Sequence, residues 1–253
     1  MTMPAGLPLG TLLRCCGRSF LLQASWNYDR LQNLGFLYQL LPGLRRLHGR
    51  QLPAAVLERY AVYFNTHPYL APWVAGTVLR LEVDRQEHAG GGIDGPGFQQ
   101  MVMAPYAAMG DALFWGAIRP LAAVIGLLLA IQGFLWAPVA LLLVYNLPHL
   151  LCRCGGLVAG FRQGLAATET LQRLRLPDLA IRVKEGTVIL LGVLCALLAE
   201  RGCGHQELAA GWGLLLLPII LIFAGLARRG VTSFVLILTT TVSLLGLAVL
   251  FKG

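Results

Sequence analysis

Charged side chains are scarce in this sequence. Asp, Glu, Lys and Arg make up 13% of its 253 residues, whereas soluble domains average about 25%. Acidic residues are the scarcest, with 12 against 20 basic ones, and hydrophobic residues reach 57%. A soluble protein with so little charge could hardly cover its surface, so the composition predicts an integral membrane protein. The basic residues lie between hydrophobic segments and form no stripe with interleaved aromatics, which argues against a nucleic-acid partner.

Motifs of the common enzyme classes are also missing. The sequence contains no HExxH, no GxSxG, no Walker loop and no paired carboxylates within a hydrophobic span. Its six cysteines include no CxxC pair and no His at zinc-ligand spacing, so we expect no metal, no other cofactor and no disulfide framework. Residues 1–13 have no basic residue ahead of their short apolar run, which predicts a retained N-terminus and no cleavable signal peptide.

Long apolar segments fill the C-terminal half. Leu121–Tyr145 and Val231–Phe251 are uncharged, and each is long enough to cross a hydrocarbon core of about 30 Å as a helix rising ~1.5 Å per residue. Trp212–Ala227 and Thr187–Ala199 are shorter, which predicts tilted or partial spans. The expected fold is an all-α integral membrane protein with about four full or partial transmembrane helices in this half.

The first hundred residues differ in kind. They carry many arginines, and apolar residues such as Val56 and Tyr60 recur at helical spacing, which predicts amphipathic helices at a membrane interface or on a partner. Leu70–Leu81 is apolar but too short to span, so we expect a re-entrant hairpin buried by protein. A glycine-rich link is expected at 89–97. The predicted division is an interfacial region at 1–100 and a membrane-spanning region at 101–253.

Basic residues also predict the orientation in the membrane. Residues 146–186 carry six basic and three acidic side chains, so this connection is expected on the cytoplasmic side, facing lipid headgroups. Residues 200–211 contain only Arg201 as a basic residue and are expected outside, while Arg228 and Arg229 return the chain inside. The predicted N-terminus is cytoplasmic and the predicted C-terminus is external.

Asp111 and Arg119 are the only charged residues between positions 101 and 120. We expect residues 101–118 and 121–145 to form a hairpin with Arg119 and Pro120 at its apex and Asp111 near membrane depth. A charge near the bilayer centre costs roughly 2.5–3.5 kcal/mol on insertion scales, so such a residue faces a bundle interior, an aqueous cavity or a partner. The two charges indicate a membrane protein that handles a polar solute.

Three segments carry a family resemblance: QASWNYDRLQNLGF at 23–36, YFNTHPYLAPWVAG at 63–76 and APYAAMGDALFWGAIRP at 104–120. They resemble, from about Leu12 to the end of the chain and in the same order, the IID membrane component of the mannose family (mannose/fructose/sorbose) of the bacterial phosphoenolpyruvate-dependent sugar phosphotransferase system. The third segment is poorer in glycine than is usual in that family. Residues 200–211 are also shorter than the polar insertion that the family often carries. These departures leave the transported sugar open.

The resemblance implies a non-catalytic subunit of the bacterial inner membrane. Such a subunit pairs with a IIC membrane subunit to form the translocator for a hexose or related sugar, and cytoplasmic IIA and IIB proteins carry the phosphoryl group. IIB phosphorylates the incoming sugar. No phosphorylated residue is expected in this chain, and His67 is not expected to carry a phosphoryl group because the resemblance assigns those sites to IIA and IIB.

The five candidate residues for substrate binding or the translocation path are Asp111, Asn65, Thr66, Trp115 and Arg119, and the first four have alternative roles. Asp111 could accept hydrogen bonds from sugar hydroxyls, or could pair with Arg119 or a helix end and hold the hairpin. Trp115 could stack on a sugar, or could anchor the chain at the membrane interface. Asn65 and Thr66 precede Pro68, where a helix is expected to break, and could line a polar cavity or cap that break.

A polar cluster in the first segment, comprising Trp26, Asn27, Asp29 and Arg30, is expected to contact IIC or to cover the path as a lid. The arginine-rich residues 146–186 could alternatively dock IIB. Two other functions remain as alternatives. A stand-alone secondary transporter would need more spans and an internal repeat, and a membrane-embedded enzyme would need chemistry whose motifs are absent.

Overall fold

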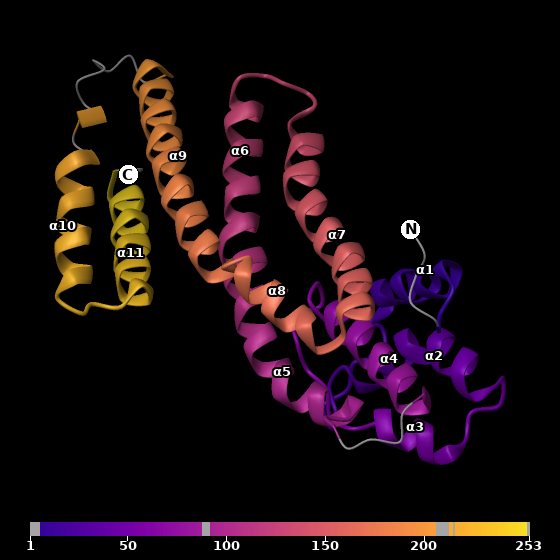
Figure 1. The fold of residues 1–253 in the computed structure, drawn as a ribbon. Helices are drawn as coiled ribbons and strands as arrows, with labels where there is room; N and C mark the ends of the chain where they lie inside the picture. The colour runs from indigo at the N-terminus through magenta and orange to yellow at the C-terminus, as the bar shows by residue number, and fades with distance from the viewer. Residues whose placement is uncertain (1–5, 88–91, 206–212, 215, 252–253) are drawn as a thin grey trace. The chain divides into compact units, whose positions relative to one another are not determined.

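The computed structural model describes residues 6–87, 92–205, 213–214 and 216–251 (Figure 1). Within these residues the chain is helical and forms no β-strand, so the expected all-α class is confirmed. The chain divides into two compact units, Met1–Leu191 and Gly192–Gly253. Residues 89–91 of the expected link and 206–211 of the expected external connection lie outside the described residues.

The first unit holds most of the helices. In chain order they are α1 (Leu9–Arg18), the 3-10 turn η1 (Ser19–Leu21), α2 (Asn33–His48), α3 (Ala54–Tyr60), α4 (Ala71–Glu87), α5 (Gly95–Gly110), the π-helix η2 (Asp111–Ile118), α6 (Arg119–Ile131), α7 (Ala137–Gln163), the 3-10 turn η3 (Gly164–Ala166), α8 (Ala167–Arg173) and α9 (Leu176–His205), which runs into the second unit. The second unit also holds α10 (Leu216–Arg228) and α11 (Ser233–Phe251).

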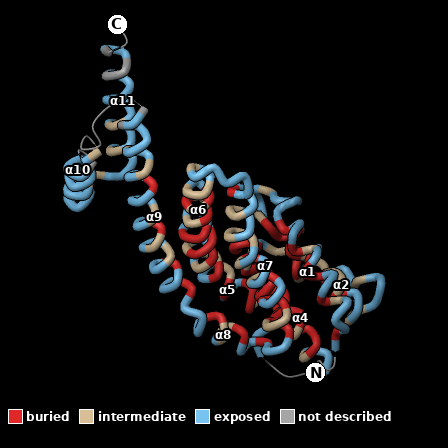
Figure 2. The backbone as a smooth tube through the Cα atoms, turned by 90° about the horizontal axis from the view of Figure 1, so that it is seen from above, coloured by how far each residue is buried: buried red, intermediate tan, exposed pale blue. Residues whose placement is uncertain are grey.

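Helix α4 is at the centre of the core of the first unit. It packs against α2, α5 and α7, and most of its residues are buried (Figure 2). Its backbone touches that of α7, because a Cβ atom at Gly76 would lie 2.2 Å from the Leu157 carbonyl oxygen and one at Gly160 would lie 2.4 Å from that of Trp73. Residues 70–79 are buried, as expected, but from Ala71 on they belong to one continuous helix and form no hairpin. Glycines and other small residues therefore position the two helices.

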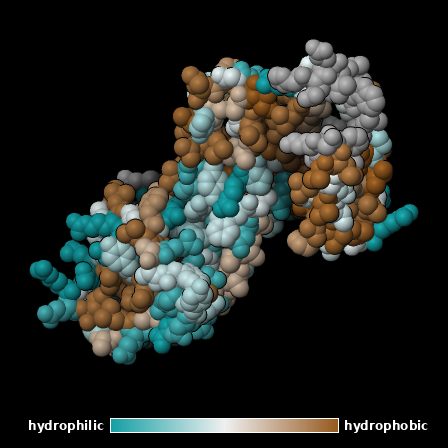
Figure 3. Space-filling model, turned by 180° about the vertical axis from the view of Figure 1, so that it is seen from behind, coloured by the Kyte–Doolittle hydropathy of each residue, from teal (hydrophilic) through white to brown (hydrophobic). Residues whose placement is uncertain are grey.

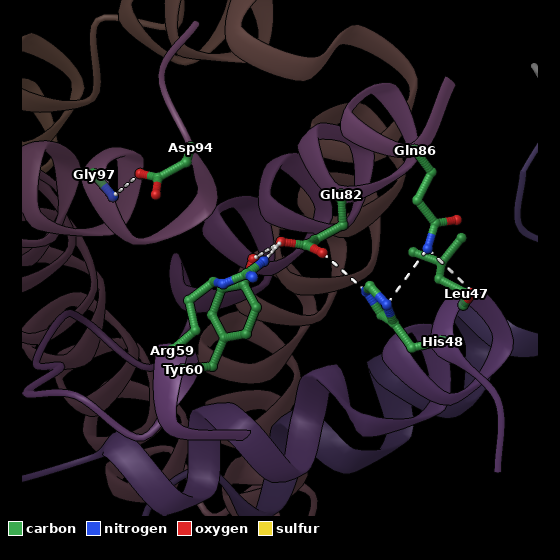
Figure 4. A network of polar contacts seen from close by, with 8 residues as sticks. All are labelled: Leu47, His48, Arg59, Tyr60, Glu82, Gln86, Asp94 and Gly97. Atoms are coloured by element: carbon green, nitrogen blue, oxygen red, sulfur yellow. Dashed lines mark hydrogen bonds and ion pairs between the residues drawn. The ribbon is translucent and has the colours of Figure 1, made fainter. Parts of the chain in front are cut away.

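A buried carboxylate ties α4 to α2 and α3 (Figure 4). Glu82 is 2% exposed and accepts hydrogen bonds from Tyr60 Oη at 2.5 Å, Arg59 Nη1 at 3.0 Å and His48 Nε2 at 3.0 Å. Burial alone would raise the pKa of Glu82, but the three hydrogen bonds and the charge of Arg59 outweigh it and hold the pKa below its ordinary value. Glu82 is therefore a charged anchor for the N-terminal helices.

The hairpin apex predicted at Arg119 and Pro120 is wrong. Residues Gly95–Ile131 form one continuous helical run, and the chain reverses only at residues 132–136. Pro120 does not end the run because it directly follows the π-helical segment, whose amides bond carbonyls five residues back and so leave more room for the proline ring than an α-helical turn would. The predicted single span Leu121–Tyr145 is therefore divided between α6 and α7.

The reversal has a recognisable helix-ending signal. Gly133 has a φ of +85°, Phe134 donates its backbone N–H to the Leu129 carbonyl at 3.1 Å, and Gly133 donates to Ala130 at 2.9 Å. These are the two hydrogen bonds of a Schellman motif, in which glycine takes the left-handed position. The break at 132–136 thus follows from local sequence.

Residues 146–186 are mostly helical and do not form a single connection between two spans. Asn146 to Gln163 continue α7, and α9 already begins at Leu176. Arg153, counted among the headgroup-facing arginines, is only 4% exposed. The small residues Gly156 and Gly160 draw this part of α7 against α4, and that contact buries Arg153 as well.

The N-terminal helices match the prediction in part. Helix α1 buries Leu12 and Cys15 and exposes Arg14, as an amphipathic helix should, although Leu9 and Leu13 are exposed as well. In contrast, the predicted amphipathic segment around Trp26 to Arg30 is built of turns.

Among the described residues, Gly95–Ile131 is the run long and apolar enough to cross a membrane by length and composition, and α10 and α11 carry shorter apolar stretches. Within the second unit, the described side chains of α10 and α11 are exposed or half-buried (Figure 2), and their surface is largely apolar (Figure 3). Apolar surface of this extent marks contact with lipid or protein.

Candidate functional site

The third sequence segment folds into the π-helix η2. This helix buries Leu113, Phe114 and Ala117 and leaves Asp111 and Trp115 exposed. Short π-helical segments occur frequently at functional sites because their wider turn re-aims side chains. The unusual backbone therefore coincides with the segment that carries the charged candidate residues.

Gly110 brings η2 into contact with the second segment. A Cβ atom at Gly110 would lie 2.2 Å from Cγ of His67, so no larger residue fits without moving the histidine ring. The ring also packs 5.3 Å from Phe114 and 4.8 Å from Trp115, measured between ring centres. His67 is thus enclosed by the third segment.

His67 holds a hydrogen-bond donor towards Asp111. Burial, together with the charges of Arg153, His149 and Arg119, lowers the pKa of His67 to about 4, so its ring is neutral near pH 7. Its Nδ1 accepts the backbone N–H of Tyr69 at 3.3 Å, which places the proton on Nε2. Nε2 lies 4.0 Å from Asp111 Oδ1 and has no hydrogen-bond partner among the described residues. This donor is therefore enclosed by the protein, whereas the Asp111 carboxylate is exposed.

The alternative pairing of Asp111 with Arg119 does not occur within the described residues. The guanidinium carbon of Arg119 instead lies 5.7 Å from the Trp115 ring centre and 5.9 Å from that of Tyr145. These distances are those of cation–π contacts.

All three sequence segments meet at one polar cavity of about 210 Å³. It contains residues of the first segment, of the second, of the third, of η1 and of α7. Its lining residues are Ser19, Phe20, Leu22, Gln23, Pro68, Tyr69, Trp115, Arg119 and Arg153. The cavity thus brings together segments that lie far apart in the sequence.

Arg153 forms the inner wall of this cavity. Its Nη1 donates to the Ser19 carbonyl oxygen at 2.5 Å and to Ser19 Oγ at 2.9 Å, and its guanidinium carbon lies 4.5 Å from the Phe20 ring centre and 5.3 Å from that of Tyr69. The Tyr69 ring stacks on His149 at 4.1 Å. Arg153 therefore fixes η1 and the second segment against α7.

Sequence analysis missed Arg153, His149 and Tyr145. Tyr145 is the last residue of a predicted span, His149 has no predicted role, and Arg153 belongs to the connection predicted to face lipid headgroups. The spacing of Asn146, His149 and Arg153 at positions i, i+3 and i+7 was an available signal, because it puts them on one face of a helix. His149 Nε2 and Asn146 Oδ1 lie 2.8 Å apart.

Asn65 and Thr66 precede the cavity but do not line it, as far as the described residues show. The Thr66 backbone is held on both sides by the Gln32 side chain, whose Oε1 accepts the Thr66 N–H at 3.0 Å and whose Nε2 donates to the Thr66 carbonyl at 2.9 Å. Thr66 thus joins the second segment to the first, and Asn65 is half-buried beside it.

The polar cluster of the first segment has a part that shapes the loop, in which Arg30 is itself exposed, and an outer part. Asn27 Oδ1 accepts the Arg30 N–H at 2.7 Å, and Arg30 Nη1 donates to the Ala61 carbonyl at 3.1 Å, so these two residues shape the loop. Trp26 and Asp29 are exposed, and Trp26 packs edge-on against Tyr28 at 4.9 Å. The outer part leaves an aromatic and an acidic group on the surface.

Comparison with known proteins supplies the family. A family model described as the PTS system mannose/fructose/sorbose family IID component matches residues 7–200. The mannose-specific EIID component of Escherichia coli K12 is 36% identical over 153 residues, which are 58% of this chain and 53% of that protein. The fructose permease IID component of Bacillus subtilis is 33% identical over 191 residues, or 72% of this chain and 66% of that protein. The aligned part thus spans about half the length of the mannose-specific relative.

Two solved structures share the fold. One, described as a membrane protein, has a TM-score of 0.73 and 25% identity, and the alignment covers 96% of this chain and 97% of that one. The other is a cryoEM structure of the mannose transporter ManYZ in complex with microcin E492, with a TM-score of 0.58, 25% identity and coverage of 98% and 97%. The resemblance carried by the three segments is confirmed, because the family model covers well over half of the chain. The chain belongs to the mannose/fructose/sorbose family of PTS IID components, which are membrane proteins.

Proposed function

We propose that the chain is the IID subunit of a sugar permease of the phosphotransferase system. With a IIC subunit it forms the translocator that imports a hexose or related sugar, and IIB phosphorylates the sugar at the cytoplasmic face with phosphoryl groups that arrive through IIA. The observation that carries the proposal is the meeting of the three family segments at one polar cavity. Relatives named for mannose and fructose support the substrate class.

The exposed Asp111 carboxylate suits a neutral polyhydroxy solute. It can accept hydrogen bonds from sugar hydroxyls, and the buried His67 ring holds the third segment in place behind it. The exposed Trp115 ring beside them offers an apolar surface for the sugar. Asp111, Trp115 and Arg119 belong to the translocation path on this proposal, and Asn65 and Thr66 set the position of the second segment along it.

This chain would position the sugar and leave the phosphoryl transfer to its partners. The His67 side chain is fully buried, and its Nδ1 already accepts a hydrogen bond. A phosphoryl carrier could not reach it without local unfolding, which supports assigning the chemistry to IIB.

The proposed location is the bacterial inner membrane, with several passes, a cytoplasmic N-terminus and an external C-terminus. Support comes from the apolar run Gly95–Ile131, from its return through α7, and from the apolar surfaces of α10 and α11. Residues 1–100 would form the interfacial region and 101–253 the membrane-spanning region.

The exposed part of the first segment is the proposed contact with IIC or lid over the path. Trp26 and Asp29 would meet the partner, while Asn27 and Arg30 keep the loop in shape. A stand-alone secondary transporter or a membrane-embedded enzyme would need no such partner.

The test is uptake of radiolabelled hexose in proteoliposomes that contain the chain alone or with the IIC-type protein encoded beside it, plus the cytoplasmic carriers. Uptake is expected only with the partner, and uptake by the single chain would refute the proposal. Within the complex, Asp111→Asn is expected to reduce uptake at least tenfold while assembly is retained. The matched control is Glu169→Gln, an exposed carboxylate on α8 that should change little. Full uptake by the Asp111→Asn complex would remove Asp111 from the path.

A further inference from the structure

The polar cavity contains a buried positive charge that no carboxylate balances within the described residues. Arg153 is 4% exposed and lines the cavity. It forms no ion pair with any described acid, and its hydrogen bonds go to the neutral Ser19. Removing an ion from water is unfavourable unless an opposite charge or several hydrogen bonds replace the lost solvation. Arg153 is therefore positioned to bind an anion.

Only part of the Arg153 guanidinium group is hydrogen-bonded within the described residues. Nη1 is fixed by Ser19, whereas Nε is buried and has no hydrogen-bond partner among the described residues. Contacts with the Phe20 and Tyr69 rings hold the group in place. A fork held in this way loses little freedom when it binds a ligand.

A second guanidinium lies in the same wall. Arg119 lines the cavity and is oriented by the Trp115 and Tyr145 rings. Asp111 is turned towards His67 and is not among the residues that line the cavity. The charged groups that line it are thus two cations.

We propose that this cavity binds a phosphate monoester. At about 210 Å³ it lies below the usual 300–1,000 Å³ of drug-sized ligand sites, so the neutralising charge must sit on one small group. A phosphate monoester carries roughly −1.5 to −2 at pH 7 and matches two guanidinium forks with its oxygens, whereas a carboxylate carries a single charge.

Two sources present this group: a phosphorylated sugar and the headgroup of a monoester lipid. The first rests on the proposed function, since a phosphorylated sugar would then be the product of the complex. The second does not depend on transport.

The test is equilibrium binding to the full chain together with its IIC-type partner in nanodiscs of zwitterionic lipid. Hexose 6-phosphate and inorganic phosphate are expected to bind in a salt-dependent manner. Arg119→Gln, an exposed position that should fold normally, is expected to weaken binding at least tenfold, which converts to about 1.4 kcal/mol. Arg153→Lys keeps the charge but loses the fork and is expected to weaken binding similarly. Arg162→Gln on the exposed end of α7 is the matched control and should bind as the unaltered protein does.

The lipid source is tested in nanodiscs that contain phosphatidic acid, with retention of the lipid followed by native mass spectrometry. Retention that is lost in Arg119→Gln, without binding of hexose 6-phosphate, supports the lipid source. Absence of both kinds of binding, or binding unchanged in Arg119→Gln and Arg153→Lys, overturns the proposal. Hexose uptake is measured separately on the same preparations. Normal uptake without phosphate binding refutes this inference alone, and phosphate binding without uptake by the complex refutes the proposed function alone.

Discussion

Replacing Glu82 by Gln should destabilise the first unit strongly. The substitution keeps the shape of the side chain but removes its charge, while Arg59 and His48 keep their positions around it (Figure 4). Gln can accept one or two of the hydrogen bonds, but its amide NH₂ group would face the donors that Glu82 now binds. The remaining arginine would lose the only carboxylate that it contacts within the described residues.

The expected size follows from the burial of the group. Breaking a buried ion pair by removing one partner costs about 3–5 kcal/mol, and Glu82 is 2% exposed. At ~2–4 °C per kcal/mol for a protein of this length, Tm should fall by roughly 10 °C. Arg59 is partly exposed, so water can solvate it in the variant and the lower part of the range is expected.

The loss should also depend on pH. The pKa of Glu82 is held below its ordinary value of 4.5 in the folded protein, so the unfolded chain binds a proton at this carboxyl more readily than the folded chain does. Its stabilising contribution is therefore complete above the unfolded pKa and is lost as the pH falls through the folded one. The difference in Tm between the unaltered protein and Glu82→Gln should shrink below pH 4.5.

The measurement is thermal unfolding in detergent, followed by circular dichroism at several pH values. Glu87→Gln is the matched control, since Glu87 is an exposed carboxylate on the same helix, and it should leave Tm within about 2 °C. A Tm of Glu82→Gln equal to that of the control at pH 7 would refute the reasoning.

Two further predictions test the packing of α7. Gly160→Ala should destabilise the protein by about 1–3 kcal/mol in the same unfolding assay, because the new methyl would lie 2.4 Å from the Trp73 carbonyl oxygen. The control Gly155→Ala has open space around it and should leave the stability unchanged. Equal Tm values for the two variants would contradict the backbone contact. Cys16 and Cys154 should form a disulfide on treatment with copper phenanthroline, because their sulfur atoms lie 3.2 Å apart. High pH is needed because burial raises the pKa of Cys16 to about 12. The gel shift should vanish in Cys154→Ser, and its absence in the unaltered protein would place α1 away from α7.

The sequence alone predicted both the fold class and the location of the site, but for different reasons. Low charge and long apolar segments are properties of composition, so the helical membrane class needed no knowledge of packing. The site was located because the three family segments supply most of its lining, including Trp115 and Arg119. Its role in transport stays a proposal.

The two wrong predictions differ in whether the sequence contained a local signal for the correct answer. The sequence predicts the hairpin apex at Arg119 and Pro120, between the apolar segments 101–118 and 121–145, whereas the true signal, Gly133 in a Schellman motif, lies thirteen residues after Pro120. This signal was local and available. The burial of Arg153 has no such local signal. It depends on the approach of η1 and on the glycine contacts between α4 and α7, which only the folded chain brings together.

The glycine contact between α4 and α7 also restricts how the cavity can change shape. With the backbones touching at Gly76 and Gly160, a shift of one helix along the other by a single residue, about 1.5 Å, would drive a side chain into the opposite backbone. Arg153 on α7 and Tyr69 at the entrance to α4 therefore move as one rigid block. Any opening of the cavity must come from the π-helical segment that holds Trp115, or must break the hydrogen bonds by which Arg153 holds η1.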